Sequence, residues 1–171
     1  MIIKNEDEII VKRIYCQIDK CLSCHSCEIA CAVTHSKSKK LVTAINENPL
    51  PLKFIKVEYI DEKGKINAKR SIAIQCRQCE DPVCLQACIT GGIYKDKESG
   101  NIVIDPEKCV GCWSCIMVCP FGVIIQNEKD HIASRCDLCA DEETPPCVVA
   151  CPTKALVYCE NNEVNIEHLE Q

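Results

Sequence analysis

The sequence has few of the residues that fill an ordinary hydrophobic core. Aromatic residues make up 4% of its 171 residues, with one Trp and two Phe. No apolar run reaches the roughly 18 residues of a membrane-spanning helix. The start, MIIKNEDEII, is charged within four residues and has neither a signal peptide nor a twin-arginine leader. We therefore expect a cytoplasmic protein without direct membrane insertion, whose fold depends on more than apolar packing.

Cysteine is the residue that the chain has in excess. It occurs 18 times, a share typical of disulfide scaffolds and metal proteins. Disulfides are rare in reducing compartments. We therefore expect the cysteines to bind metal clusters, in an anaerobic host, and the chain to be largely disordered without them.

The clearest motif is a run of four cysteines that begins at Cys109 and ends at Cys119-Pro120, with the spacing C-x2-C-x2-C-x3-C-P. This is the bacterial-ferredoxin pattern for a [4Fe-4S] cluster. The two-residue spacers let one loop present three thiolates to a cubane, and Gly111 allows a close backbone approach. The fourth cysteine lies one helical turn further along and serves a neighbouring cluster. Pro120 is expected to end the helix.

Three further groups of four cysteines accompany this run. The first repeats its spacing, the second has the spacing x2, x4, x3, and the fourth has x2, x7, x3. Structural zinc sites, the alternative, are usually built from two separated C-x2-C pairs, which three consecutive cysteines do not resemble. Sixteen cysteines therefore predict four [4Fe-4S] clusters, from groups one (Cys21, Cys24, Cys27, Cys31), two (Cys76, Cys79, Cys84, Cys88), three (Cys109, Cys112, Cys115, Cys119) and four (Cys136, Cys139, Cys147, Cys151).

Strands and hairpins are expected between the cysteine groups. A turn at 61–64 and a smaller one at 98–101 each separate two β-like segments. Residues 32–52 are polar and are expected to form a loop with at most a short helix. Strands are predicted over 9–18, 54–60, 66–74, 155–158 and 163–166, with the last two paired as a hairpin.

The order of the groups predicts how they combine. The short hairpin at 98–101 joins groups two and three, so we pair these two, and groups one and four then pair across the chain. The sequential pairing, one with two and three with four, is the alternative. With crossover ligation the nested pairing predicts four sets: Cys21, Cys24, Cys27 and Cys151; Cys31, Cys136, Cys139 and Cys147; Cys76, Cys79, Cys84 and Cys119; Cys88, Cys109, Cys112 and Cys115.

The fold class expected is α+β, with two ferredoxin-like modules related by pseudo-symmetry, small β-hairpins and short helices. The segment from Ile14 to Cys21 parallels that from Ile102 to Cys109, which supports an internal repeat. The outer module is predicted to span 9–35 and 128–166, the hairpin-containing insertion 36–74, and the inner module 75–127.

These four groups, with x4 in the second and a widened spacer in the fourth, resemble the four-cluster ferredoxin-like subunits of the dimethyl sulfoxide reductase and formate dehydrogenase class. The segments 27–36 and 109–122 resemble those of the iron-sulfur protein that accepts electrons from carbon monoxide dehydrogenase. They also resemble electron-transfer subunits of formate hydrogenlyase and hydrogen-dependent carbon dioxide reductase. The resemblance implies nested pairing. Cys31 and Cys88 lack the proline that follows Cys119 and Cys151.

The expected function is electron relay without a substrate site, because no nucleophile constellation, phosphate loop or open metal site is recognisable. The resemblance implies transfer from carbon monoxide dehydrogenase to a hydrogenase or another acceptor. The alternative is a wire or filament-forming subunit of a formate dehydrogenase/hydrogenase or aldehyde oxidoreductase complex. A reductase that acts by itself is a third reading. The formal charge of −5, to which four clusters add roughly −8, argues against a nucleic-acid partner.

Several residues outside the groups have both a structural and a functional reading. Cys16 and Cys159 are expected to be small buried side chains, although a reactive thiol is the alternative. His25 is expected to be a solvated loop residue that could also tune a cluster. Trp113 is expected to pack locally, with shielding of a cluster as the alternative. His35 is expected at the surface.

Overall fold

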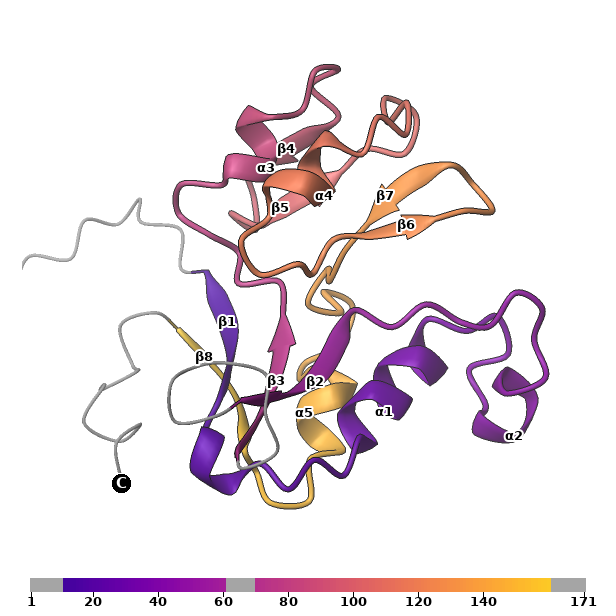
Figure 1. The fold of residues 1–171 in the computed structure, drawn as a ribbon, viewed down its shortest axis with the longest axis vertical. Helices are drawn as coiled ribbons and strands as arrows, with labels where there is room; N and C mark the ends of the chain where they lie inside the picture. Colours follow the sequence, from indigo (N-terminus) through magenta and orange to yellow (C-terminus); the bar gives the residue numbers. More distant parts are fainter. Residues whose placement is uncertain (1–10, 61–69, 161–171) are drawn as a thin grey trace, which may run out of the picture.

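The computed structural model describes residues 11–60 and 70–160. It is an α+β fold of short helices and two-stranded antiparallel sheets, as expected from the sequence (Figure 1). The elements are β1 Lys12–Cys16, η1 Ile18–Lys20, α1 Ser26–Thr34, α2 Leu41–Ala44, β2 Ile55–Ile60, β3 Arg70–Gln75, α3 Val83–Gln86, β4 Ile93–Lys95, β5 Ile102–Ile104, α4 Ser114–Val118, β6 Ile125–Asn127, β7 Ile132–Ser134, α5 Pro146–Val149 and β8 Leu156–Glu160.

The sheet β1–β8 joins segments from opposite ends of the described chain. Ile14 lies opposite Tyr158, and Cys16 lies opposite Leu156. The strands predicted over 9–18 and 155–158 are therefore present, but β8 has β1 as its described partner. The partner expected from the sequence, 163–166, lies outside the described residues. Pairing of β1 with β8 brings the first and fourth cysteine groups together.

Hairpins connect the remaining strands. β2 and β3 pair as predicted, and their turn at 61–64 lies outside the described residues. β4 and β5 pair around the predicted turn at 98–101, where the Asp96 carboxylate accepts a hydrogen bond from the Ser99 amide at 2.8 Å. The hairpin of β6 and β7 was not predicted. Its strands have three residues each, too few to show a clear alternation.

The elements gather into two groups in space (Figure 1). One contains α3, α4 and the hairpins β4–β5 and β6–β7, and its core is built on Ile93, Ile102 and Ile124. The other contains α1, α5, β1–β8 and β2–β3, and its core is built on Ile14, Ile55 and Leu156. We call these the upper and lower groups after their places in Figure 1.

The two repeats of the C-x2-C-x2-C-x3-C motif lead into helices of different length. α4 ends at Val118, because Cys119 is extended (φ −69°, ψ 113°) ahead of Pro120. This confirms the expected role of Pro120. α1 continues through Cys31 to Thr34, because no proline follows Cys31. The extra turn carries His35 to the end of the helix, where its amide donates to the Cys31 carbonyl at 3.1 Å.

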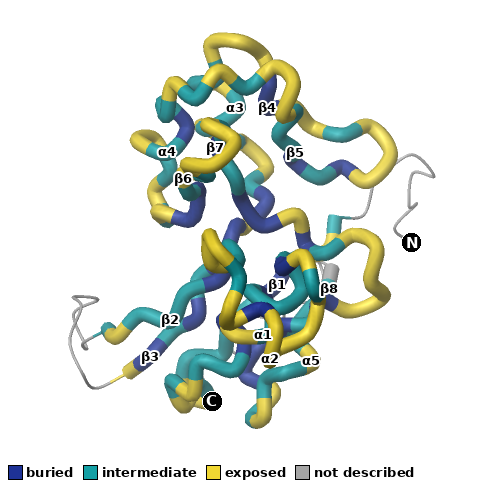
Figure 2. The backbone as a smooth tube through the Cα atoms, turned by 90° about the vertical axis from the view of Figure 1, so that its right-hand side faces the viewer, coloured by how far each residue is buried: buried dark blue, intermediate teal, exposed yellow. Residues whose placement is uncertain are grey.

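Cysteines make up a large part of the buried apolar residues in the described chain. The buried backbone runs through the centre of each group and between them (Figure 2). The buried apolar residues of the described chain include Cys27, Cys31, Cys76, Cys115, Cys136 and Cys147. Among the described helices, none has the length and hydropathy needed to span a membrane.

Candidate iron-sulfur centres

The loop of the third cysteine group depends on Gly111. Its φ is +65°, and a Cβ added there would overlap the backbone carbonyl oxygen of His131. The structure thus shows a close approach of the His131 backbone to this glycine, whereas the sequence analysis expected the approach of the loop to a cluster, which stays a prediction. In the first group, Ser23 takes the equivalent position with φ +52°. The two loops therefore share a backbone path that turns successive cysteines toward one centre.

One cavity in the upper group is lined by four cysteines: Cys88, Cys109, Cys112 and Cys115. The last three come from the loop before α4, whereas Cys88 comes from the end of the second cysteine group. The structure therefore brings together one complete set of the crossover scheme. Cys112 is exposed and Cys115 is buried, so the site reaches from the core to the surface.

A matching cavity in the lower group is lined by Cys21, Cys24, Cys27 and Cys151. This is the corresponding set from groups one and four. Cys16 lines the same cavity and accepts a hydrogen bond from the Ala73 amide at 3.4 Å. The site therefore holds a fifth thiol, which the sequence analysis did not assign to it.

The Cys31 set lies beneath the surface in the lower group. Burial, together with the neighbouring charges of Cys31 and Cys139, raises the pKa of the Cys147 thiol to about 12. Burial also raises the pKa of Cys136 strongly, with contributions from the charges of Cys147 and Cys31. Cys147 thus lies near Cys31 and Cys139, and Cys136 lies near Cys147 and Cys31 but also near Cys76 of another predicted set.

The Cys76 set lies between the upper and lower groups. Burial raises the pKa of the Cys76 thiol, the charge of Arg135 lowers it, and the charges of Cys79 and Cys119 raise it. Burial likewise raises the pKa of Cys84, which also lies near Cys76 and Cys119. The two cavities combine group two with group three and group one with group four, as the nested scheme predicts and the sequential one does not. The Cys31 and Cys76 sets follow from the same scheme and stay a prediction.

The donor chemistry of these sites fits a cationic iron core. Buried thiols that lie side by side do not ionise readily by themselves, as the raised pKa values of Cys115, Cys139 and Cys147 show. A bound metal core offsets both the burial and the repulsion between thiolates. Sets of four thiols in ferredoxin-type loops suit a [4Fe-4S] cluster. The sixteen cysteines of the four groups form no disulfides in the described structure.

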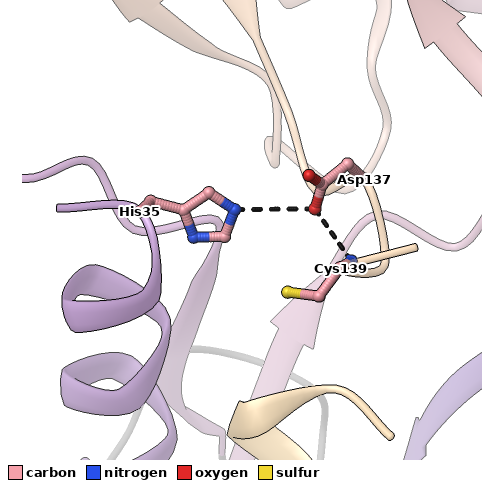
Figure 3. Close-up of side chains that lie close together, drawn as sticks. All are labelled: His35, Asp137 and Cys139. Atoms are coloured by element: carbon pink, nitrogen blue, oxygen red, sulfur yellow. Dashed lines mark hydrogen bonds and ion pairs between the residues drawn. The ribbon is translucent and has the colours of Figure 1, made fainter. Parts of the chain in front are cut away.

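His35 is not the surface residue that the sequence suggested. Its Nδ1 lies 2.8 Å from the Cys31 carbonyl oxygen and 3.7 Å from Cys31 Sγ, and its ring packs edge-on against Phe54. Its Nε2 lies 3.5 Å from Asp137 Oδ1, which accepts a hydrogen bond from the Cys139 amide at 2.9 Å (Figure 3). Burial lowers the pKa of His35, but the contacts with Asp137 and Cys31 raise it to about 10.

The arrangement in Figure 3 could also bind a metal ion through His35, Asp137 and Cys139. Cys139 belongs to the four-thiol set with Cys31, so we assign the contact a structural role. Asp137 ties the loop of the fourth cysteine group to the end of α1. It thereby fixes two segments that contribute thiols to the same site.

Hydroxyl groups accompany Cys88 and Cys151, two of the four cysteines that cross between groups in the nested scheme. Cys88 Sγ lies 3.6 Å from the Thr90 hydroxyl, and Cys151 Sγ lies 3.8 Å from the Thr153 hydroxyl. The hydroxyl follows its cysteine by two residues in both cases. Hydrogen bonds to ligand sulfurs are one of the means by which a protein sets cluster potentials.

His25 and Trp113 occupy equivalent positions before α1 and α4. Both have left-handed backbone conformations, with φ +57° and +62°. His25 Nδ1 lies 3.3 Å from the Glu28 carboxylate, so His25 is not simply solvated. Trp113 lines the cavity of the Cys88 set and packs against the core of the upper group. Trp113 therefore packs locally, as expected, and its side chain also forms part of the wall of the Cys88 site.

Arg135 and Gln78 are the polar residues that the sequence analysis missed. Arg135 Nη1 donates to Cys76 Sγ at 3.0 Å, and its Nη2 donates to Gln78 Oε1 at 3.2 Å. Both residues are buried, with exposed fractions of 7% and 2%. Their positions in the sequence could have indicated them, because Arg135 directly precedes the first cysteine of group four and Gln78 lies inside group two.

Arrays of cysteine thiols in this arrangement are the binding sites of multi-cluster iron-sulfur proteins. A family model described as 4Fe-4S dicluster domain matches residues 69–161. The chain is 41% identical over 159 residues to "Iron-sulfur protein" of Rhodospirillum rubrum, with 84% of this chain and 79% of that protein covered. The chain therefore belongs to the 4Fe-4S dicluster ferredoxin-like family and binds multiple [4Fe-4S] clusters.

Two further relatives carry descriptive names. "Electron transport protein HydN" of Escherichia coli K12 is 35% identical over 161 residues, covering 85% of this chain and 86% of HydN. "Thiosulfate reductase electron transfer subunit PhsB" of Salmonella typhi is 30% identical over 156 residues, covering 86% of this chain and 75% of PhsB. The similarity in each case extends over most of both chains.

Proposed function

We propose that this protein is a non-catalytic electron-transfer subunit that relays single electrons through four [4Fe-4S] clusters. The observation that carries the proposal is the pair of cavities that are each lined by three cysteines of one group and a fourth from a distant group. The related proteins named for electron transport support the same function.

The proposed ligands are the sets given by the nested scheme: Cys21, Cys24, Cys27 and Cys151; Cys31, Cys136, Cys139 and Cys147; Cys76, Cys79, Cys84 and Cys119; Cys88, Cys109, Cys112 and Cys115. Bound clusters supply one-electron redox chemistry. The chain's own residues hold them, exclude water from the buried sets and donate hydrogen bonds to their sulfurs.

The proposal includes two ferredoxin-like modules related by pseudo-symmetry. The inner module is assigned to 75–127 and the outer module to 9–35 and 128–166, with 36–74 as an insertion. The correspondence of β1–β8 with β4–β5 supports this division, because each sheet joins the strand before a three-cysteine loop to the strand after a crossover cysteine.

Electrons are proposed to enter and leave at the two exposed thiols, Cys24 and Cys112. They belong to different modules and occupy the same position in their loops. Exposed apolar side chains line the same cavities as the two thiols, with Leu22 69% exposed near Cys24 and Val110 65% exposed near Cys112. Tunnelling partners need close contact without intervening water, and such surfaces provide it.

The proposed donor is carbon monoxide dehydrogenase, and the proposed acceptor is a hydrogenase or another redox enzyme. The alternative is a wire or filament-forming subunit of a formate dehydrogenase/hydrogenase complex or an aldehyde oxidoreductase complex. We place the protein in the cytoplasm, since its free thiols suit a reducing compartment.

Metal analysis tests the number of clusters. Anaerobically purified protein should contain about 16 iron and 16 acid-labile sulfide per chain. About four zinc per chain in place of iron would refute the proposal. About eight iron per chain would mean that only two of the four proposed sites hold a cluster. The chain itself should show no substrate-dependent change in its electron-paramagnetic-resonance spectrum.

A pull-down from the native host under anaerobic conditions tests the partners. Recovery of carbon monoxide dehydrogenase would support the preferred donor. Recovery of a formate dehydrogenase with an iron hydrogenase would favour the alternative, and electron microscopy of the purified protein would then show whether it forms filaments.

A further inference from the structure

The buried Arg135 connects the second and fourth cysteine groups. These two segments meet where the upper and lower parts of the fold join. Arg135 belongs to the segment of the fourth cysteine group and directly precedes Cys136. Its guanidinium reaches Cys76, the first cysteine of the second group, at 3.0 Å. The contact therefore joins the segment that supplies Cys136 and Cys139 to Cys76, which belongs to a different predicted ligand set.

The charge of Arg135 has no carboxylate partner in the part of the chain that the structure describes, since none of the ion pairs found there includes it. A buried charge is costly unless it is paired and hydrogen-bonded. Its contacts are with Cys76 Sγ and with the neutral Gln78 amide oxygen. With the proposed ligation, the iron-bound Cys76 thiolate is the anionic group beside this guanidinium.

Gln78 holds the guanidinium in place. Its Oε1 accepts from Arg135 Nη2 at 3.2 Å and from the Ile102 amide at 2.8 Å, and its Nε2 donates to the Cys136 carbonyl at 3.5 Å. Gln78 thus contacts β5 on one side and the fourth cysteine group on the other. These hydrogen bonds hold the Gln78 amide in place, and Gln78 in turn holds the Arg135 guanidinium against Cys76.

The repeat shows that this contact is not a general requirement of the loop. The residue equivalent to Arg135 before the second group is Gln75, whose Nε2 donates to the Ile14 carbonyl at 2.6 Å and not to a cysteine sulfur. The residue equivalent to Gln78 in the fourth group is Leu138, also 2% exposed and also with positive φ. The same backbone is thus built without a charged donor.

From this geometry we propose that Arg135 is a positioning residue that raises the reduction potential of the cluster held by Cys76, Cys79, Cys84 and Cys119. Reduction adds negative charge to a cluster. A positive charge and a hydrogen bond at a ligand sulfur stabilise that added charge, and burial strengthens both effects. This cluster therefore accepts an electron more readily than it would without Arg135. The inference depends on the proposed ligation.

The test is an anaerobic redox titration of the full-length holoprotein, followed by electron paramagnetic resonance. In Arg135→Gln we expect one of the four midpoint potentials to fall and the other three to stay. Arg135→Lys keeps the charge but loses the two-pronged geometry, so the same midpoint should fall by less. Cys76→Ser identifies the cluster concerned, because its signal is the one that changes.

Arg77→Gln is the matched control. Arg77 lies one residue after Cys76 and carries the same charge, but it is exposed and its guanidinium lies 4.9 Å from the centre of the Phe121 ring. Its removal should leave all four midpoints unchanged. If the same midpoint potential fell equally in both variants, the loss of any nearby positive charge would explain the effect. That result would overturn the proposal.

Iron content separates the possible failures. If the wild-type protein lacks about 16 iron, the proposed function fails. If Arg135→Gln keeps its iron but none of its midpoints moves, the inference alone fails. If that variant loses iron, Arg135→Lys decides, since a single lowered midpoint supports the proposal and four unchanged ones refute it.

Discussion

Single residues decide whether these loops can surround a cluster, and Gly111 is the clearest case. Its positive φ excludes most side chains at a cost of roughly 1–2 kcal/mol, and the His131 carbonyl leaves no room for a Cβ. The sequence indicated the need for this glycine through its place in the motif. It did not indicate the obstructing carbonyl, because His131 belongs to the unpredicted β6–β7 hairpin.

Gly111→Ala should therefore disrupt the site of Cys109, Cys112 and Cys115. We expect iron to fall from about 16 to about 12 per chain, the loss of one cluster, measured anaerobically after purification. Gly91→Ala is the control, since Gly91 has the same φ of +65° and nothing within 4 Å of an added Cβ. Equal iron in the two variants would show that the overlap with His131 is unimportant.

The fifth thiol of the Cys21 site makes a second prediction. Cys16 lines that cavity, but the four loop cysteines complete the proposed ligand set. Cys16→Ser should keep about 16 iron, whereas Cys21→Ser should lose about four. A loss of iron in Cys16→Ser, with retention in Cys21→Ser, would make Cys16 the ligand in place of Cys21.

At the scale of elements, α1 is attached to β2 by the Glu28 carboxylate. Glu28 is buried, accepts a hydrogen bond from the Val57 amide at 2.7 Å and pairs with Lys53. The ion pair with Lys53, the Val57 amide and a contact with His25 hold the pKa of Glu28 below its usual value against the opposing effect of burial. The helix that carries Cys27 and Cys31 is thereby fixed to the β2–β3 hairpin.

Replacement of this carboxylate should loosen α1. Glu28→Ala leaves the Val57 amide without its partner, so we expect a loss of about 1–3 kcal/mol in stability. It should appear as a lower guanidinium midpoint for the bleaching of cluster absorption under anaerobic conditions. Glu58→Ala removes a more exposed ion pair with Lys56 and should cost under about 1 kcal/mol. Equal midpoints for the two variants would contradict the role given to Glu28.

Elements differ in how far the sequence predicts them. The hairpin at 98–101 has a clear turn signal between two apolar segments, and the structure confirms it. The partner of β8 was not recognisable, since antiparallel pairing between distant segments leaves no local pattern and β1 lies at the other end of the described chain. The contact of Arg135 with Cys76 was hidden for the same reason, because it depends on how two distant loops pack.

For the whole molecule, the clusters are expected to take the place of a large core. Much of the buried apolar surface is cysteine, and the two cores otherwise depend on a few aliphatic side chains. The motif spacing predicted the four groups of cysteines because it is a local property. Their arrangement relative to one another required the structure.

Iron removal tests this dependence. Anaerobic treatment with a chelator and a reductant should abolish most secondary structure, because repulsion and burial of the thiols then have no compensation. Circular dichroism should show the loss, and rebuilding with iron and sulfide should restore it. A chain that kept its native spectrum without iron would show that packing alone maintains the fold.

The pairing of β1 with β8 also constrains how a cell makes this protein. A ribosome releases Cys21, Cys24 and Cys27 long before Cys151, so their site stays incomplete until nearly all described residues have been synthesised. Those three thiols meanwhile remain open to stray metal ions and oxidants. We therefore expect the assembly machinery to load this site after translation, and its neighbour, which needs Cys147, at the same late stage.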